Sequence, residues 1–322
     1  MPNPNYKKYQ GDLFIADASM IRTKELQPLM ATNWFSLSKD PRSEPIVHEY
    51  DRYMVRIENW TGRGIATIWD HDLLIFLISQ LVHSHNRGEE TGPAIAFTGY
   101  EFFQFHQRKW RRGITGKRSY DLLWAALERL HTTHIRTTVK PLNDPEYLRK
   151  KPTAQQVADR KQQIVSLDRR RAQKKLENID EAEAQFYWLP HIEKLKWRDE
   201  NEVGYVVHLD PTVYEWTKNL SNVLTLSPAY FDLTSGIARF IYLWARKSVG
   251  DRSPNQDWTE SFDSLYEKSG STGNKRQFRQ YLRRLIKQNN LPSYHLSEEI
   301  HPQGPKLVAR TRTFEELPEL KF

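Results

Sequence analysis

The chain has 322 residues, which is long for one ordinary domain, so two domains are expected. Hydrophobic residues make up 38% and include ten Trp, enough to build packed cores, whereas 27% charged residues and a mean hydropathy of −0.74 favour a soluble protein. An excess of 48 Lys and Arg over 40 Asp and Glu gives a net charge of +8, which favours polyanionic partners such as nucleic acid.

The chain contains no Cys, which excludes disulfides, thiolate metal sites and cysteine nucleophiles. No apolar run approaches membrane-spanning length, and the first twenty residues lack the order of a secretory signal. We therefore expect a cytoplasmic protein without a membrane partner.

Residues 1–50 hold several Pro and no sustained period, and are expected to form an N-terminal arm that docks through Trp34, Phe35 and Leu37. The next block, 51–211, carries both helical and strand-like spacing. It predicts helices at 70–84, 98–107 and 119–131, and strands at 53–57, 94–97, 132–140, 185–189, 192–197 and 205–209.

Local signals mark the ends of several of these elements. Asp70 precedes the first apolar-periodic residue of its helix and is the expected N-cap. Thr98, followed three residues later by Glu101, matches a capping box. Residues 199–202 separate the last two strands and are expected to form a hairpin turn.

A charged segment interrupts the first block at 143–183. It has few large apolar residues, so we expect an exposed insertion that is helical over 154–178. Residues 149–175 hold ten cations against Asp159 and Asp168. This run is either an arm that binds DNA or an ordinary solvated surface, and the sequence leaves both open.

The second block, 212–314, is mainly helical before a pair of strands, and an acidic tail follows at 315–322. Helices are expected at 211–219, 228–231, 235–247, 262–268 and 274–289, and the two strands lie within 292–312. Both blocks thus show helices, a turn, a further helix and then strands, an order typical of a winged helix. The predicted fold is α+β, with two tandem winged-helix domains, an N-terminal arm and a charged insertion in the first domain.

The strongest candidate site is the helix at 274–289, which has six cations and no acid. The cations are Lys275, Arg276, Arg279, Arg283, Arg284 and Lys287. Those at 275, 279, 283 and 287 recur every four residues and are expected to form one stripe opposite an apolar stripe. Like charges at this spacing repel, so a phosphate partner would relieve a cost.

A helix of this kind fits the major groove, where Arg can contact guanine O6 and N7. Gln280 and Asn274 are candidates to contact adenine, and Ser271 and Thr272 in the preceding turn are candidates to contact phosphate. The alternative is a solvated basic face without a ligand. The helix, turn and strand pair around it favour duplex DNA as the partner.

A second basic cluster precedes the third helix of the first block, and contact with the DNA backbone is expected there. Its cations are Arg108, Lys109, Arg111, Arg112, Lys117 and Arg118. The alternative is an ordinary solvated loop.

Two pairs of closely spaced His raise the question of a metal site. His83 and His85, and His131 and His134, have no Cys or nearby carboxylate to complete a ligand set, so no metal cofactor is expected. A nicking enzyme would need a His-hydrophobic-His pair, and Ser84 stands between His83 and His85.

Stretches spread over residues 12–290 resemble plasmid replication initiators of the replication-initiator-A family. They are DLFIAD at 12–17, FSLSK at 35–39, GIATIWD at 64–70, LIFLISQL at 74–81, FTGY at 97–100, YDLLWAALERL at 120–130, VLTL at 223–226, YF at 230–231 and LYEKSGS at 265–271.

The resemblance implies a protein that binds repeated origin sequences and recruits host replication factors, such as an initiator or helicase, without catalysis or cofactor. It also implies that the second winged helix contacts the repeat in the major groove, while the first serves dimerisation and backbone contact. Two alternatives remain open: a strand-nicking replication enzyme that uses Tyr281 or Tyr266, and a winged-helix transcriptional repressor.

Overall fold

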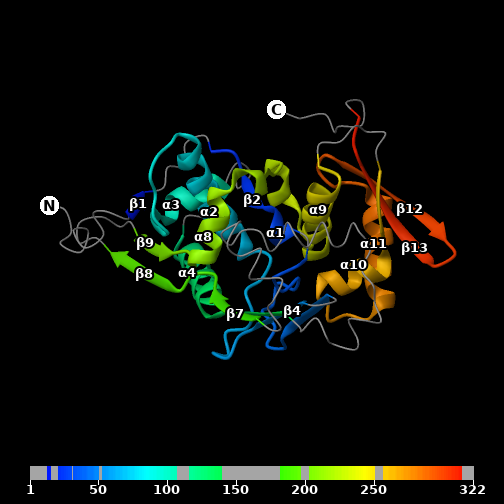
Figure 1. Cartoon of the computed structure of the whole chain (residues 1–322), viewed down its shortest axis with the longest axis horizontal. Helices are drawn as coiled ribbons and strands as arrows, with labels where there is room; N and C mark the ends of the chain where they lie inside the picture. The colour runs from blue at the N-terminus through cyan, green and yellow to red at the C-terminus, as the bar shows by residue number, and fades with distance from the viewer. Residues whose placement is uncertain are drawn as a thin grey trace.

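The computed structural model describes residues 13–15, 21–30, 32–50, 53–106, 116–139, 182–196, 203–250 and 257–313 (Figure 1). Several predictions fall outside these residues. They are the helix at 154–178, the hairpin turn at 199–202, the acidic tail at 315–322 and the cations Arg108, Lys109, Arg111 and Arg112. The described part of the chain contains both helices and strands throughout its length, which confirms a mixed α and β protein.

One four-stranded antiparallel sheet has the order β3-β4-β6-β7. Its strands are β3 (Ile46–Tyr50), β4 (Tyr53–Glu58), β6 (His134–Val139) and β7 (Ala182–Tyr187). Ile57, Ile135 and Phe186 lie side by side across it on the buried face. Val139 pairs with Ala182, so the end of β6 and the start of β7 lie side by side.

A second four-stranded sheet has the order β1-β5-β9-β8. Its strands are β1 (Leu13–Ile15), β5 (Ala94–Thr98), β8 (His191–Lys196) and β9 (Val203–His208). β8 and β9 pair antiparallel, as expected for the predicted hairpin, and β9 also pairs with β5. The helices of this half are α2 (His71–Asn86), α3 (Gly99–His106) and α4 (Lys117–Thr132). No helix in the described part of the chain is long and apolar enough to cross a membrane.

The two predicted helix starts differ in their chemistry. At α3 the capping box is confirmed, because the Glu101 carboxylate accepts the Thr98 N–H at 2.6 Å and the Thr98 hydroxyl accepts the Glu101 N–H at 3.2 Å. At α2 the predicted start is right, but the Asp70 side chain makes no cap hydrogen bond. Its carboxylate instead binds Arg129 of α4, with N–O distances of 2.7 and 2.6 Å.

The first 50 residues contain more secondary structure than the expected arm. β1, β2 (Lys24–Leu26), α1 (Gln27–Met30) and β3 all lie there. β2 pairs antiparallel with β10 (Val223–Thr225), some 200 residues later in the chain. The expected docking through Phe35 is found, since its ring stacks on His71 at 4.4 Å and on Trp188 at 5.2 Å. This segment is therefore part of the folded core.

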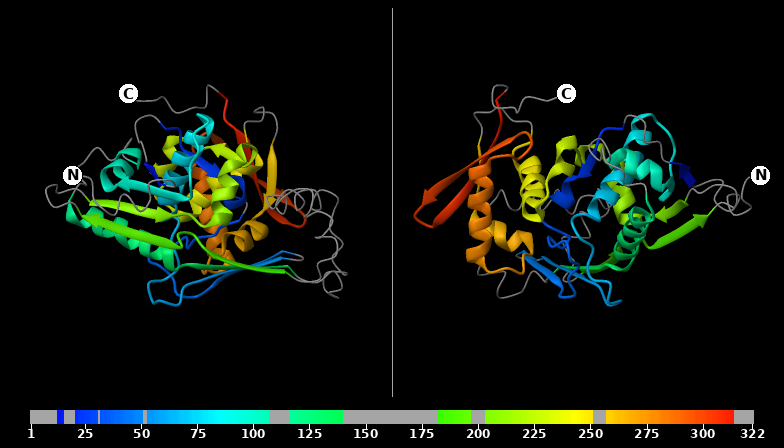
Figure 2. Two further views of the ribbon diagram at one scale, coloured as in Figure 1. Left: turned by 60° about the vertical axis from the view of Figure 1, so that its left-hand side comes forward. Right: turned by 180° about the vertical axis from the view of Figure 1, so that it is seen from behind.

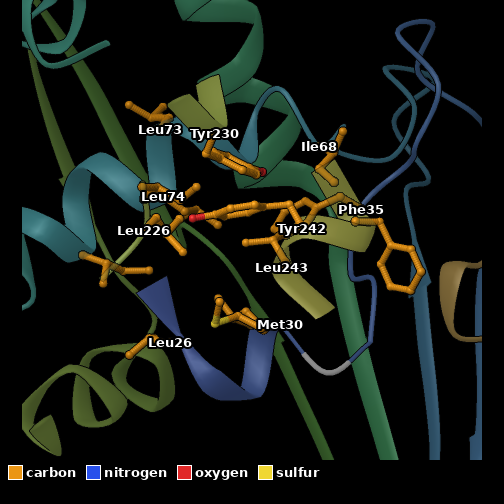
Figure 3. Packing of buried hydrophobic residues seen from close by; sticks show 14 of the residues in the cluster. Leu26, Met30, Phe35, Ile68, Leu73, Leu74, Leu226, Tyr230, Tyr242 and Leu243 are labelled. Atoms are coloured by element: carbon orange, nitrogen blue, oxygen red, sulfur yellow. The ribbon is translucent and has the colours of Figure 1, made fainter. Parts of the chain in front are cut away.

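The segment after β9 continues that core. It contains α8 (Pro211–Lys218), two short 3-10 helices at Leu220–Asn222 and Pro228–Asp232, and α9 (Gly236–Ser248). In Figure 3, Tyr230 and Tyr242 lie beside Leu73 and Leu74 of α2, and Leu226 lies close by. The two Tyr rings are 5.3 Å apart. One apolar cluster therefore joins residues from both predicted blocks.

The C-terminal elements are β11 (Trp258–Ser261), α10 (Phe262–Ser269), α11 (Lys275–Gln288), β12 (Tyr294–His301) and β13 (Gly304–Thr311). The strands form a sheet with the order β11-β13-β12. The right-hand view in Figure 2 shows β12 and β13 as a long hairpin that projects beside α11. The predicted bounds of α10 and α11 agree with the structure to within one residue.

Candidate nucleic-acid interface

α11 is capped at its N-terminus and packed along one side. Asn274 is its N-cap, with the side-chain oxygen accepting the N–H of Gln277 at 2.8 Å. Phe278, Leu282 and Leu285 are buried against the core, as the apolar spacing predicts. The capping bond engages the amide oxygen of Asn274, which weakens the prediction that this side chain contacts adenine in the bidentate way.

The regular stripe at every fourth residue does not form a free cationic face. Arg279 donates from Nε and Nη2 to Asp263 of α10, at 3.2 and 2.7 Å. Lys275 Nζ lies 3.5 Å from Glu267, also on α10. The repulsion expected between like charges is therefore relieved within the protein, and phosphate is not needed for this.

Arg283 is paired on the other side, with the hairpin. Its Nε lies 3.1 Å from both carboxylate oxygens of Glu298 on β12, and its Nη2 lies 2.8 Å from Oε1. The hydrogen bond and charge of Glu298 raise the pKa of Arg283. The guanidinium also lies 5.9 Å from the centre of the Phe262 ring.

The exposed face of α11 extends beyond the predicted stripe, because a spacing of four residues drifts by about 40° around the helix at each step. The exposed residues of the helix are Lys275, Arg276, Gln277, Gln280, Tyr281, Arg283, Arg284, Lys287 and Gln288. Among the exposed cations, Arg276, Arg284 and Lys287 form no ion pair with a residue that the structure describes. Arg284 lies over the ring of Tyr281 at 5.3 Å, and Tyr281 is 47% exposed.

The turn between α10 and α11 depends on a left-handed residue. Gly270 has φ of 60°, and a Cβ there would come within 2.7 Å of Ile46 on β3. Ser271 is half-buried and its N–H donates to the Ser269 hydroxyl at 3.1 Å, while Thr272 is exposed. Of the two residues predicted to contact phosphate, Thr272 is thus the more accessible.

The same turn is bound by the N-terminal segment, a contact that the sequence pattern did not reveal. Asn33 donates its backbone N–H to the Lys268 carbonyl at 3.0 Å and its side-chain amide to the Ser269 carbonyl at 2.8 Å. Arg42 donates to the Gly270 carbonyl at 2.7 Å. These contacts fix the turn between α10 and α11 on the first half of the molecule.

Of the second predicted cluster, the structure describes Lys117 and Arg118. Both are exposed in the first turn of α4, whose N-cap is Gly116. They lie on a different helix from α11, and no hydrogen bond or ion pair links the two helices among the described residues.

The other candidate chemistries gain no support from the geometry. No group of His, Asp or Glu in the described residues is arranged to hold a metal ion. His131 instead shares a 2.7 Å hydrogen bond with the Leu189 carbonyl. Tyr266 donates its hydroxyl to the Gly273 carbonyl at 2.9 Å, which holds it in the turn before α11.

The family model for Replication initiator protein A matches residues 24–150 and 166–296. The chain belongs to this family. A protein of Wigglesworthia glossinidia brevipalpis named "Putative replication protein" is 30% identical over 258 residues, which cover 79% of this chain and 78% of that protein.

The fold is similar to that of another protein of known structure. Domains 2 and 3 of RctB superpose with a TM-score of 0.56 and 13% identity, covering 89% of this chain and 99% of that one. At this identity the likeness concerns the fold alone. The superposition extends over both halves of the chain.

Proposed function

We propose that this protein is an origin-binding replication initiator that reads repeated duplex DNA through the exposed face of α11. The observation that supports this most is a set of exposed cations on that face, Arg276, Arg284 and Lys287, which form no ion pair with any residue that the structure describes. They lie on the same helix as the exposed amides of Gln277 and Gln280. Cations there can neutralise phosphate, and Arg and amide side chains can contact purine edges in the major groove.

The surrounding topology supports this use of α11. From α9 the order is helix, strand, two helices and a hairpin, with β13 between β11 and β12. This order is typical of a winged helix, in which the second helix of the helix-turn-helix enters the major groove. We assign residues 236–311 as the DNA-binding winged helix and propose that the hairpin of β12 and β13 lies against the DNA backbone.

The first half would supply affinity and assembly. Lys117 and Arg118 are exposed at the start of α4 and are suited to backbone contact. Pairing of two copies and recruitment of a host initiator or helicase complete the proposed role, with no strand cleavage by this chain. A repressor of the same fold would share the DNA contact and differ in lacking origin opening.

Salt dependence of binding tests the electrostatic part. If about six phosphates are neutralised, log K should fall against log salt with a slope of roughly −5. Replacing Arg276 and Arg284 together with Ala should reduce the slope by about 2, while Lys218→Ala on α8 should leave it unchanged. Binding without salt dependence would contradict the proposal.

The nicking alternative is tested separately. Supercoiled plasmid that carries the bound sequence is incubated with the protein and Mg²⁺. The proposal expects the plasmid to stay covalently closed. Nicked circles that disappear with Tyr281→Phe or Tyr266→Phe would show an enzyme instead.

A further inference from the structure

Two acidic residues flank α11 from different elements, and each binds one of its arginines. Asp263 lies in the first turn of α10, and Glu298 lies on β12 of the hairpin. Asp263 binds Arg279, with a shortest N–O distance of 2.7 Å, and Glu298 binds Arg283, with a shortest distance of 2.8 Å. Both acids carry a charge that repels the DNA backbone. Their position next to a proposed DNA-binding helix is therefore unfavourable for phosphate binding alone and indicates a second role.

The geometry of the pairs leaves the reading end of each guanidinium free. Arg279 and Arg283 both use Nε and Nη2 toward the carboxylate. The remaining hydrogens, on Nη1 and the far side of Nη2, point along the axis of the side chain. That end-on pair of donors is the one that matches O6 and N7 of guanine.

The side chains are also accessible from the exposed face of α11. The Arg279 side chain is 38% exposed and that of Arg283 is 54% exposed. On a helix, a residue lies next to those three and four positions away. Arg279 therefore neighbours Arg276, and Arg283 neighbours Gln280. The two paired arginines therefore border the face that is proposed to enter the groove.

Arg283 is constrained in a second way. The guanidinium lies over the Phe262 ring, with 5.9 Å between the guanidinium carbon and the ring centre. The ring restricts the tilt of the guanidinium, and the carboxylate of Glu298 restricts its rotation. A side chain fixed in this way loses little freedom when it contacts a base.

We propose that Asp263 and Glu298 are positioning residues that orient Arg279 and Arg283 toward guanine, so that these acids set the sequence specificity of α11. This rests on the proposed function above. The negative charge of the acids lowers the non-specific attraction of α11 for phosphate, while their hydrogen bonds fix the orientation of its two arginines toward the bases. The ratio of specific to non-specific DNA affinity is therefore raised.

The test compares two DNA affinities for each variant at one salt concentration. The wild-type chain first selects a preferred duplex from a random-sequence library. Binding to that duplex and to a scrambled duplex of the same length and composition is then measured by fluorescence anisotropy. The variants are Asp263→Asn and Glu298→Gln, each of which keeps shape and removes the charge.

The proposal expects the ratio of specific to non-specific affinity to fall by about tenfold in each variant. Affinity for the scrambled duplex should rise slightly, because a repelling charge is gone. Repeating the selection with Glu298→Gln should relax the preferred sequence at one base pair. Arg283→Lys should lower the ratio similarly, since an ammonium cannot make the planar bidentate contact.

Glu299→Gln is the matched control. It removes the same charge from the next residue of β12, whose side chain points to the opposite face of the strand. Its ratio should equal that of the wild type. Circular dichroism and thermal unfolding confirm that each variant is folded.

Two results would overturn the inference alone. In both, the wild type selects a duplex. In the first, the affinities of the variants for the preferred and the scrambled duplex rise together, which would mean that the acids only neutralise charge. In the second, neither affinity changes. If the wild type selects no duplex at all, the proposed function itself fails, and the inference fails with it.

Discussion

Arg239 of α9 and Asp72 in the first turn of α2 form a buried ion pair with an N–O distance of 2.7 Å, although 167 residues separate them. His106 of α3 approaches the other oxygen of Asp72 at 2.9 Å. Nε2 of the neighbouring residue, His71, lies 2.5 Å from Oε2 of the buried Glu25 of β2. The start of α2 thus connects elements from the N-terminal segment, the first block and the second block.

Loss of Arg239 should therefore destabilise the whole molecule. Arg239→Met leaves the carboxylate of Asp72 buried with only His106 as a partner, and we expect unfolding free energy to fall by about 3–5 kcal/mol in urea titration. Lys218→Met, which removes an exposed cation from α8, should change it by less than about 1 kcal/mol. Equal effects of both substitutions would contradict the role given to the pair.

Acid should weaken the same pair. Burial alone would raise the pKa of Asp72, but the charge of Arg239 and the hydrogen bond from His106 together bring it below 3.8. A carboxyl with a lowered folded-state pKa stabilises the fold above its unfolded pKa, and this contribution is lost as pH falls through the folded value. The free energy of unfolding should drop between about pH 5 and pH 3, and less steeply in Asp72→Asn.

His48 gives a second pH dependence, at the contact between the first half and the turn that joins α10 to α11. Its ring is buried and hydrogen-bonded to the Asn33 carbonyl at 2.7 Å. Burial lowers its pKa below 6.5, against the effect of the backbone hydrogen bonds. The neutral form favours folding, so stability should be full above pH 6.5 and fall as pH decreases through the folded-state value.

The measurement is thermal unfolding at a series of pH values. As the pH falls below about 6.5, the wild type should lose more stability than His48→Gln, which cannot become charged. Parallel curves for the two proteins would show that His48 does not contribute.

Gly270→Ala should disturb the turn before α11. The left-handed φ costs about 1 kcal/mol for Ala, and the added Cβ would meet Ile46 at 2.7 Å, so we expect a total loss of about 2 kcal/mol or more. Gly116→Ala is the control, because its Cβ would meet nothing within 4 Å and its φ of −83° suits any residue. A similar loss in both variants would contradict the close approach.

Strong local patterns predicted the helices well. The apolar spacing of α11 and the capping box of α3 depend on residues within a few positions of each other, so they are visible in one segment. β2 and β10 were not predicted, because each has three residues and their pairing depends on the fold. β3 was missed for a similar reason, since its partner β4 supplies its pattern of burial.

The helix that carries the candidate site was predicted, whereas the ion pairs of its cations were not. The helical drift of the every-fourth-residue spacing and the acids of neighbouring elements decide which cations form ion pairs among the described residues. Asp263 and Glu298 lie far enough from Arg279 and Arg283 in sequence that only tertiary packing brings them together. The division into arm and tandem winged helices stays a prediction.

The central claim is that the exposed face of α11 binds repeated DNA sequences. Footprinting on the DNA that flanks the gene tests it most directly, at about 150 mM salt to suppress non-specific binding. We predict evenly spaced protected sites with the wild type and with Lys218→Ala, and loss of these sites when Gln280 and Arg284 are both replaced by Ala. Absence of discrete protection with the wild type, or unchanged protection with the double variant, would contradict the claim.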